Sequence, residues 1–210
     1  MSNRRPGGDS LLHDAQTLEF YDKNARSYVA ARSAGVSPDL MAFLLRLKAG
    51  ASILELGCGD GHDASEMERL GFSVEPTDGS AAMAAIASDR LGREVQVLRF
   101  EELDATRRYD AVVACASLLH VPAEGLPAVL KRIWEALKPG GWHFASFKTA
   151  GQASYDEHGR YYNYLDRTGA EVAYCSAGQW DAMHFETYEG TGFFNAPAIW
   201  LTVEAQKPGF

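Results

Sequence analysis

Three glycines at alternate positions form the part of the chain best suited to hold a ligand: Gly57, Gly59 and Gly61. Glycine carries no Cβ, so such a turn can bend sharply and lets a ligand lie against its backbone. Glu55, two residues before the first glycine, adds a carboxylate at the end of a short apolar run. A helix is expected to begin near His62. A buried strand, a glycine turn and a helix in this order predict a site for a nucleotide-like cofactor.

A second carboxylate, Asp78, is expected beside the glycine turn. It ends the second expected strand, residues 72–77, and is followed by Gly79 and Ser80. In open α/β sheets, ligands bind beyond the carboxyl ends of the strands. There the Asp78 carboxylate can accept hydrogen bonds from two ribose hydroxyls. The alternative role for Asp78 is a cap for the helix that starts at Ser80.

Candidate residues for the rest of the site follow the third and fourth expected strands. Phe100 and Glu101 offer an apolar surface and a carboxylate suited to an adenine ring and its amino group, although a polar loop that begins a helix has the same composition. Residues 115–120 are expected to form the floor between cofactor and substrate. Within this floor, His120 is the candidate base because imidazole titrates near neutral pH. The alternative is a histidine bonded to the local backbone.

The stretch 148–164, after the fifth expected strand, is rich in aromatic and basic side chains. It contains Tyr155, His158, Arg160, Tyr161, Tyr162 and Tyr164. Functional loops gather at this end of an α/β sheet. We therefore expect a lid or wall of the acceptor pocket, in which Arg160 binds an anionic group. An edge loop folded on the surface is the alternative.

Apolar strands that alternate with helices of about ten residues must position these side chains. Strands are expected at 53–56, 72–77, 95–98, 109–116 and 142–147, and helices at 63–70, 81–90 and 126–137. This order predicts a doubly wound, mostly parallel α/β sheet. Two further alternating segments, 180–188 and 199–205, are joined by 189–192. They predict a C-terminal antiparallel hairpin that completes a seven-stranded sheet.

Helices are expected before this core. Apolar and aromatic residues recur at helical spacing between 11 and 32 and predict one or two short helices, and Ser37 followed by Pro38 predicts the start of another. We expect a single domain over residues 1–210. Its expected parts are a mobile tail at 1–10, a helical cap at 11–48 and an α/β core at 51–206.

Composition restricts the class of ligand. The formal net charge of −8 and the lack of a basic stripe argue against nucleic acid or a membrane surface as a partner and favour a small-molecule acceptor. No apolar run approaches the roughly 20 residues of a membrane span, and the amino terminus lacks the apolar segment of a secretory signal. The three cysteines include no CxxC pair and the six histidines show no metal-binding spacing, so we expect no metal and a cytoplasmic location.

Two classes of nucleotide cofactor compete for the glycine turn. The nicotinamide fingerprint G-x-G-x-x-G requires a glycine where this chain has His62. The sequence instead reads E-x-G-x-G-x-G from Glu55 to Gly61. Together with Asp78 and the Lys-Pro-Gly-Gly turn at 138–141, this pattern resembles the class I S-adenosylmethionine-dependent methyltransferases over about residues 35–205.

A longer string narrows this resemblance. Residues 20–25 read Phe-Tyr-Asp-Lys-Asn-Ala, and Tyr28 follows them. Later in the chain come Asp-Gly-Ser at 78–80 and then Met83. The combination looks like the small bacterial methyltransferases grouped with tellurite-resistance proteins. The wider family implies a Rossmann-like seven-stranded sheet, S-adenosylmethionine as cofactor, and methyl transfer to a small molecule.

The resemblance also implies a set of cofactor-binding residues. They are Tyr21, Tyr28, Glu55, Gly57, Cys58, Gly59, Gly61, Asp78, Gly79, Met83, Phe100, Glu101, Cys115 and Ala116. The acceptor pocket is expected to include Ser117, Leu118, His120, Lys148, Arg160, Tyr161 and Tyr162. Tyr21 and Tyr28 are expected to close over the cofactor and Met83 to pack near the adenine. Ordinary helix packing is the alternative for all three.

The expected reaction is in-line attack of an acceptor atom on a sulfonium methyl group. Holding the two reactants in line and excluding water can supply much of the acceleration without a protein nucleophile. For a hydroxyl or a protonated amine as acceptor, His120 is the first candidate base. A nicotinamide-dependent oxidoreductase and a non-catalytic S-adenosylmethionine-binding module are the alternative functions. The sequence leaves open the oligomeric state and the acceptor, including a metalloid oxyanion.

Overall fold

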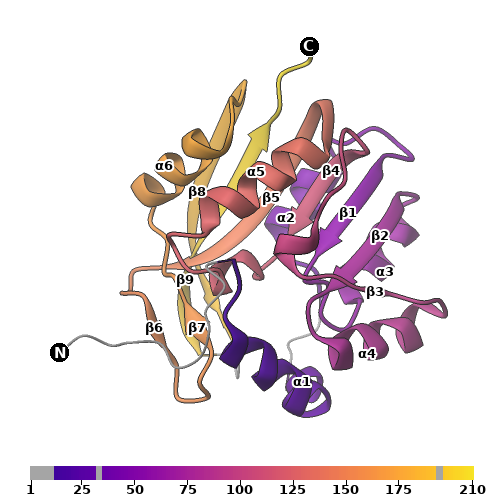
Figure 1. Ribbon diagram of the computed structural model, residues 1–210. Helices are drawn as coiled ribbons and strands as arrows, with labels where there is room; N and C mark the ends of the chain where they lie inside the picture. Colours follow the sequence, from indigo (N-terminus) through magenta and orange to yellow (C-terminus); the bar gives the residue numbers. More distant parts are fainter. Residues whose placement is uncertain (1–11, 32–34, 193–195) are drawn as a thin grey trace.

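The computed structural model describes residues 12–31, 35–192 and 196–210. Its main sheet has seven strands in the order β3-β2-β1-β4-β5-β9-β8 (Figure 1). The strands are β1 (Ser52–Leu56), β2 (Ser73–Asp78), β3 (Gln96–Val97), β4 (Tyr109–Ala114), β5 (Leu137–Thr149), β8 (Ala182–Thr191) and β9 (Pro197–Gln206). The expected mobile tail at 1–10 lies outside the described residues.

Strand direction confirms the predicted sheet. The pairs among β1 to β5 are all parallel, whereas β9 pairs antiparallel with both β5 and β8. The chain order therefore reverses between β1 and β4, which are neighbours at the centre. At such a switch point the loops that follow the two strands separate and leave room for a ligand.

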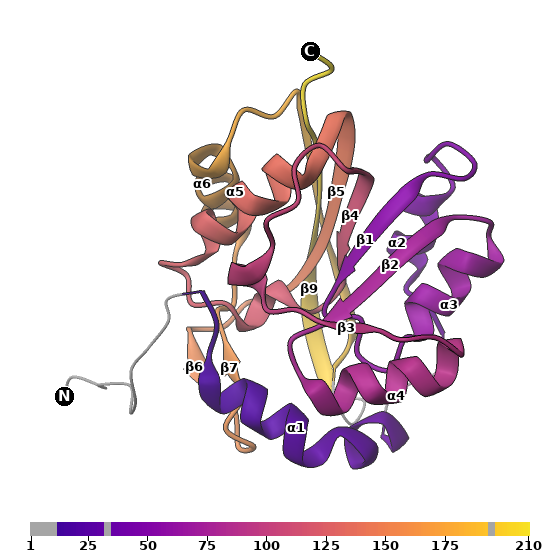
Figure 2. The ribbon, with the colours of Figure 1, turned by 45° about the vertical axis from the view of Figure 1, so that its right-hand side comes forward.

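Helices cover both faces of the sheet (Figure 2). They are α1 (Ala15–Ala30), α2 (Pro38–Leu44), α3 (His62–Arg69), α4 (Ala81–Leu91), α5 (Leu126–Ala136) and α6 (Arg167–Ala177), with short 3-10 helices η1 (Phe100–Glu102) and η2 (Leu118–His120). Leu54 of β1 packs in the core under α5 and α6, and its neighbour Ile53 packs against α2 and α3 on the other face. This alternation is why the central strands read as continuous apolar runs.

Two predicted helix starts are confirmed by their caps. The Ser37 hydroxyl accepts from the backbone N–H of Leu40 (3.1 Å) at the start of α2, and the Ser80 hydroxyl accepts from Met83 (3.2 Å) at the start of α4. Within the described residues 12–31 there is one helix, α1, capped by Asp14 through the N–H of Thr17 (2.8 Å). Each cap satisfies a backbone donor that the first helical turn leaves unpaired.

The expected ends of several strands were wrong. β5 begins at Leu137 rather than 142, because the register against β4 shifts between Tyr109 and Ala111 and the glycines at 140 and 141 continue the strand through the irregularity. β3 contains only two residues instead of 95–98. β8 continues to Thr191, so the hairpin connection lies after 191 and not at 189–192.

The structure also contains elements that the sequence reasoning missed. Helix α6 buries Ala170, Ala173, Tyr174 and Ala177, a spacing of three or four residues typical of one helix face. Within 148–164, strands β6 (Ser154–Tyr155) and β7 (Tyr161–Tyr162) pair antiparallel. The aromatic-rich stretch is therefore a short hairpin and not an irregular loop.

Candidate functional site

The glycine turn after β1 is held tightly against its neighbours. Gly57, Gly59 and Gly61 have φ angles of 75°, 59° and 75°, a region that side chains with a Cβ disfavour. The N–H groups of residues 57 and 58 both donate to the carbonyl of Thr77 (2.9 Å each), which fixes the turn to β2. A Cβ at position 57 would lie 2.5 Å from the Cβ of Ser117, so only glycine fits there.

Asp78 connects the turn to the start of α4. Its carboxylate accepts from the N–H of Gly59 through Oδ2 (2.8 Å) and from the N–H of Ser80 through Oδ1 (2.8 Å). Burial raises the pKa of Asp78 to about 6 even though these two hydrogen bonds lower it. The side chain that caps α4 is Ser80, and Asp78 instead lines the cavity beside the glycine turn.

A cavity of about 180 Å³ opens at this switch point. Most of the predicted cofactor residues line it: Tyr21, Tyr28, Glu55, Gly57, Cys58, Gly59, Asp78, Gly79, Met83, Phe100, Cys115 and Ala116. Gly61 and Glu101 do not line it. Gly61 packs against Ala87 of α4, and Glu101 pairs with Nδ1 of His13 at 2.6 Å.

Several cavity residues were not predicted from the sequence. They are His13, Asp14, Thr17, Leu18, Asp60, Asp63, Leu98 and Arg99. The first four come from α1 and its cap, a segment whose path across the sheet edge has no local sequence signal. Asp60 and Asp63 flank the last glycine of the turn, so their positions in the motif could have identified them.

Of the residues predicted for the acceptor pocket, some line the cavity and others lie outside it. Ser117 and His120 line the cavity. Leu118, the first residue of η2, has no exposed surface and packs in the main core. Leu118, which was expected in the acceptor pocket, does not line this cavity. The other four predicted residues lie outside the cavity lining and near His120: Lys148 in β5, Arg160 just before β7, and Tyr161 and Tyr162 in β7.

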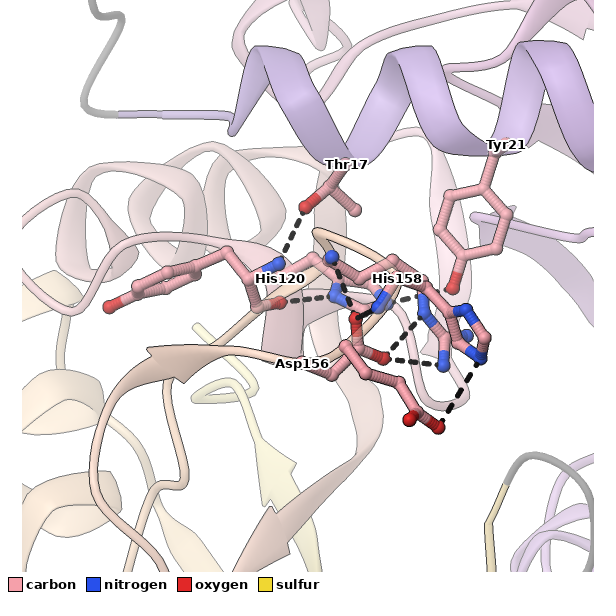
Figure 3. Close-up of polar contacts among 8 residues, drawn as sticks. Thr17, Tyr21, His120, Asp156 and His158 are labelled. Carbon is pink, nitrogen blue, oxygen red and sulfur yellow. Dashed lines mark hydrogen bonds and ion pairs between the residues drawn. The ribbon is translucent and has the colours of Figure 1, made fainter. Parts of the chain in front are cut away.

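His120 is bonded at both ring nitrogens. Nδ1 lies 2.5 Å from the carbonyl oxygen of Tyr161, and Nε2 lies 2.9 Å from the hydroxyl of Tyr21. A carbonyl only accepts, so Nδ1 carries the proton and the Tyr21 hydroxyl donates to Nε2. Figure 3 shows Thr17 and Tyr21 extending from α1 toward this polar group. The Thr17 hydroxyl accepts from the N–H of Tyr161 (2.8 Å), which ties α1 to β7.

Burial sets the charge states of His120 and Tyr21. Burial, aided by the nearby cations Arg160 and Lys148, lowers the pKa of His120 to about 4, although the hydrogen bond to the Tyr161 carbonyl raises it. Burial also raises the pKa of Tyr21 well above its ordinary value. At neutral pH the imidazole and the phenol are therefore both uncharged, and the imidazole keeps a lone pair on Nε2.

The two cations beside His120 have different partners. The Arg160 guanidinium donates to Oδ2 of Asp156 through Nε (2.9 Å) and through a terminal nitrogen (2.7 Å). It also lies over the rings of Phe20, Tyr28 and Tyr162 at 5.0, 5.9 and 5.5 Å. Nζ of Lys148 lies 4.3 Å from the ring centroid of Tyr162, and no carboxylate of the residues described in the structure forms an ion pair with it.

Sheet order, the switch-point cavity and the glycine turn with its neighbouring acid define the fold of a class I methyltransferase. Two solved structures share this fold. The 1,6-didemethyltoxoflavin-N1-methyltransferase of Burkholderia thailandensis is 20% identical, with a TM-score of 0.72 over 98% of this chain and 93% of that one. TehB of Haemophilus influenzae is 15% identical, with a TM-score of 0.65 over 90% of this chain and 67% of that one.

The chain belongs to the methyltransferase domain family, whose model matches residues 24–187. A curated relative, the ubiquinone biosynthesis O-methyltransferase of Nitrobacter winogradskyi, is 30% identical over 141 residues. That alignment covers 65% of this chain and 46% of the relative, so the chain spans about half the length of the curated protein that it matches. No helix among the described residues is long and apolar enough to cross a membrane.

Proposed function

We propose that this protein is a methyltransferase that uses S-adenosylmethionine and methylates a small molecule. The observation that carries the proposal is the cavity at the switch point, which brings the glycine turn, Asp78 and the Tyr21–His120 pair to one place. The names of the similar proteins agree with it, because they include methyltransferases of small molecules such as 1,6-didemethyltoxoflavin.

The lining of the cavity fits this cofactor. The backbone at Gly59, where the nearest atom to an added Cβ would be Cε of Met83 at 3.6 Å, leaves room for the methionine portion, and the Asp78 carboxylate suits the ribose hydroxyls. Met83, buried against the turn, and Phe100 supply apolar surface for the adenine. When bound, S-adenosylmethionine supplies an electrophilic methyl group on a positively charged sulfur.

The protein's own side chains exclude water from the site and accept a proton. Helix α1 lies along the cavity, with Tyr21 and Tyr28 in its lining, and keeps water away from the reacting atoms. His120 is the candidate base, with a lone pair on Nε2 that the Tyr21 hydroxyl contacts. We assign the Tyr21 phenol as the link through which a proton from the acceptor reaches His120.

A cytoplasmic location is part of the proposal. Within the part of the chain that the structure describes, Cys58, Cys115 and Cys175 are not joined in disulfides, which suits a reducing compartment. The net charge of −8 supports a small-molecule acceptor over nucleic acid.

Calorimetry with S-adenosylmethionine tests the cofactor assignment. We expect saturable binding to the wild-type protein and a loss of about tenfold or more in affinity for Asp78→Ala, because the carboxylate that accepts from the ribose is gone. Asp89→Ala, an exposed change on α4, is the matched control and should bind as the wild type does. No heat of binding with the wild type would contradict the proposal.

Turnover separates an enzyme from a binding module. Formation of S-adenosylhomocysteine with a panel of hydroxyl, amine and thiol acceptors supports catalysis. Binding without turnover on every acceptor of the panel would favour the non-catalytic module.

A further inference from the structure

The cations next to His120 are not equivalent. Arg160 is only 3% exposed, and its guanidinium is paired with Asp156 four residues earlier in the same hairpin. An arginine held in this way is already neutralised and is stacked among aromatic rings. It serves the hairpin as a positioning residue, although the sequence had suggested it as the anion-binding group.

Lys148 differs from Arg160 in its surroundings. Within the described ranges, no carboxylate comes within ion-pair distance of its ammonium, which instead faces the rings of Tyr162 (4.3 Å) and Trp200 (6.0 Å). Burial and the nearby Arg160 lower the pKa of Lys148, whereas the more distant carboxylate of Asp156, which is paired with Arg160, raises it. A half-buried ammonium without an ion-pair partner is stabilised when an anion joins it.

The position of Lys148 places this charge at the acceptor side of the site. It is the last residue but one of β5, which runs parallel to β4, so it lies at the same sheet edge as the end of β4. The Tyr162 ring contacts both residues, with its centroid 4.3 Å from Nζ of Lys148 and 4.8 Å from the imidazole centroid of His120. The glycine turn and Asp78 are on the other side of β4.

We infer that the methyl acceptor carries an anionic group, a carboxylate or a phosphate, which is bound by the ammonium of Lys148. This inference rests on the proposed function and adds the substrate class. The anion balances the charge of the ammonium and holds the acceptor at the edge of the sheet where Tyr162 connects Lys148 to His120. A neutral acceptor leaves that charge unbalanced and is bound more weakly.

Titration with simple anions tests the inference before the acceptor itself is identified. Sodium benzoate, inorganic phosphate and the neutral benzyl alcohol are titrated by calorimetry into the protein, both alone and with S-adenosylhomocysteine. We expect at least one anion to bind saturably to the wild type and about tenfold more weakly to Lys148→Met, which keeps the aliphatic stem over Tyr162 but removes the charge. Benzyl alcohol should not distinguish the two proteins.

Three comparisons make the result decisive. Lys148→Arg should restore most of the affinity, and Lys131→Met, an exposed change on α5, should leave it unaltered. Binding of benzoate alone indicates a carboxylate, and binding of phosphate alone indicates a phosphate ester. Equal affinity in wild type and Lys148→Met, or no saturable binding of either anion, overturns the inference. The affinity for S-adenosylmethionine is measured on the same samples. If the protein binds S-adenosylmethionine but no anion, the inference about the acceptor fails and the proposed function stands.

Discussion

At the scale of single residues, His120 shows how the fold sets a proton's position. The carbonyl of Tyr161 and the hydroxyl of Tyr21 occupy its two nitrogens, so one tautomer is fixed. Composition alone predicted a histidine that titrates near neutral pH. Burial instead lowers its pKa to about 4, which keeps the neutral form through the physiological range.

This charge state can be measured directly. In the wild type we expect the imidazole shifts of His120, followed by NMR and assigned with His120→Asn, to show no titration between pH 8 and 5.5. The Tyr21 hydroxyl stabilises the neutral imidazole by donating to Nε2. Tyr21→Phe removes this hydrogen bond and should therefore raise the pKa of His120 by about half to one unit. Tyr28→Phe is the control for loss of a nearby phenol. A wild-type midpoint near 6.5, or a lower pKa in Tyr21→Phe, contradicts the assignment.

The residue scale also shows where sequence reasoning was insufficient. Asp78, Ser37 and Ser80 were placed from local patterns, because caps and strand-end acids have recognisable neighbours. Arg160 was recognised as a candidate, but its partner Asp156 depends on a hairpin that the pattern did not predict. Leu118 was expected in the acceptor pocket because it follows the fourth strand; its burial in the core was not predictable, since a 3-10 turn leaves no periodic signal.

At the scale of elements, the glycine turn combines two separate requirements. All three glycines adopt left-handed backbone angles, but only Gly57 also lies where a Cβ would overlap Ser117. At Gly59 the nearest atom to an added Cβ is Cε of Met83, at 3.6 Å. The turn is therefore packed at its first glycine and open at its second.

The two positions form a matched pair for a stability measurement. Gly59→Ala should lose about 1–2 kcal/mol of unfolding free energy, because a residue with a Cβ is disfavoured at this backbone angle. Gly57→Ala should lose about 1–3 kcal/mol more, because Ser117 or the turn must move to admit the methyl group. Denaturant unfolding of the three proteins measures the difference. Equal losses would show that the contact with Ser117 is not restrictive.

At the scale of the whole molecule, strand order decides where the chemistry is placed. Residues from α1, the glycine turn, Asp78 and η2 meet because β1 and β4 are neighbours at the point where the order reverses. The alternation of strands and helices predicted this arrangement from sequence. The course of α1 across the cavity was not predictable, because it depends on contacts such as those of Asp22 with Ser80 (2.6 Å) and Asp14 with Tyr155 (2.7 Å).

A crystal structure of the protein with S-adenosylhomocysteine tests the central claim most directly. The account predicts that the ligand fills the switch-point cavity, with its ribose hydroxyls within hydrogen-bonding distance of the Asp78 carboxylate and its adenine against Met83 and Phe100. The sulfur should point toward Ser117 and the Tyr21–His120 pair. A ligand bound elsewhere, or a ribose turned away from Asp78, would contradict the account.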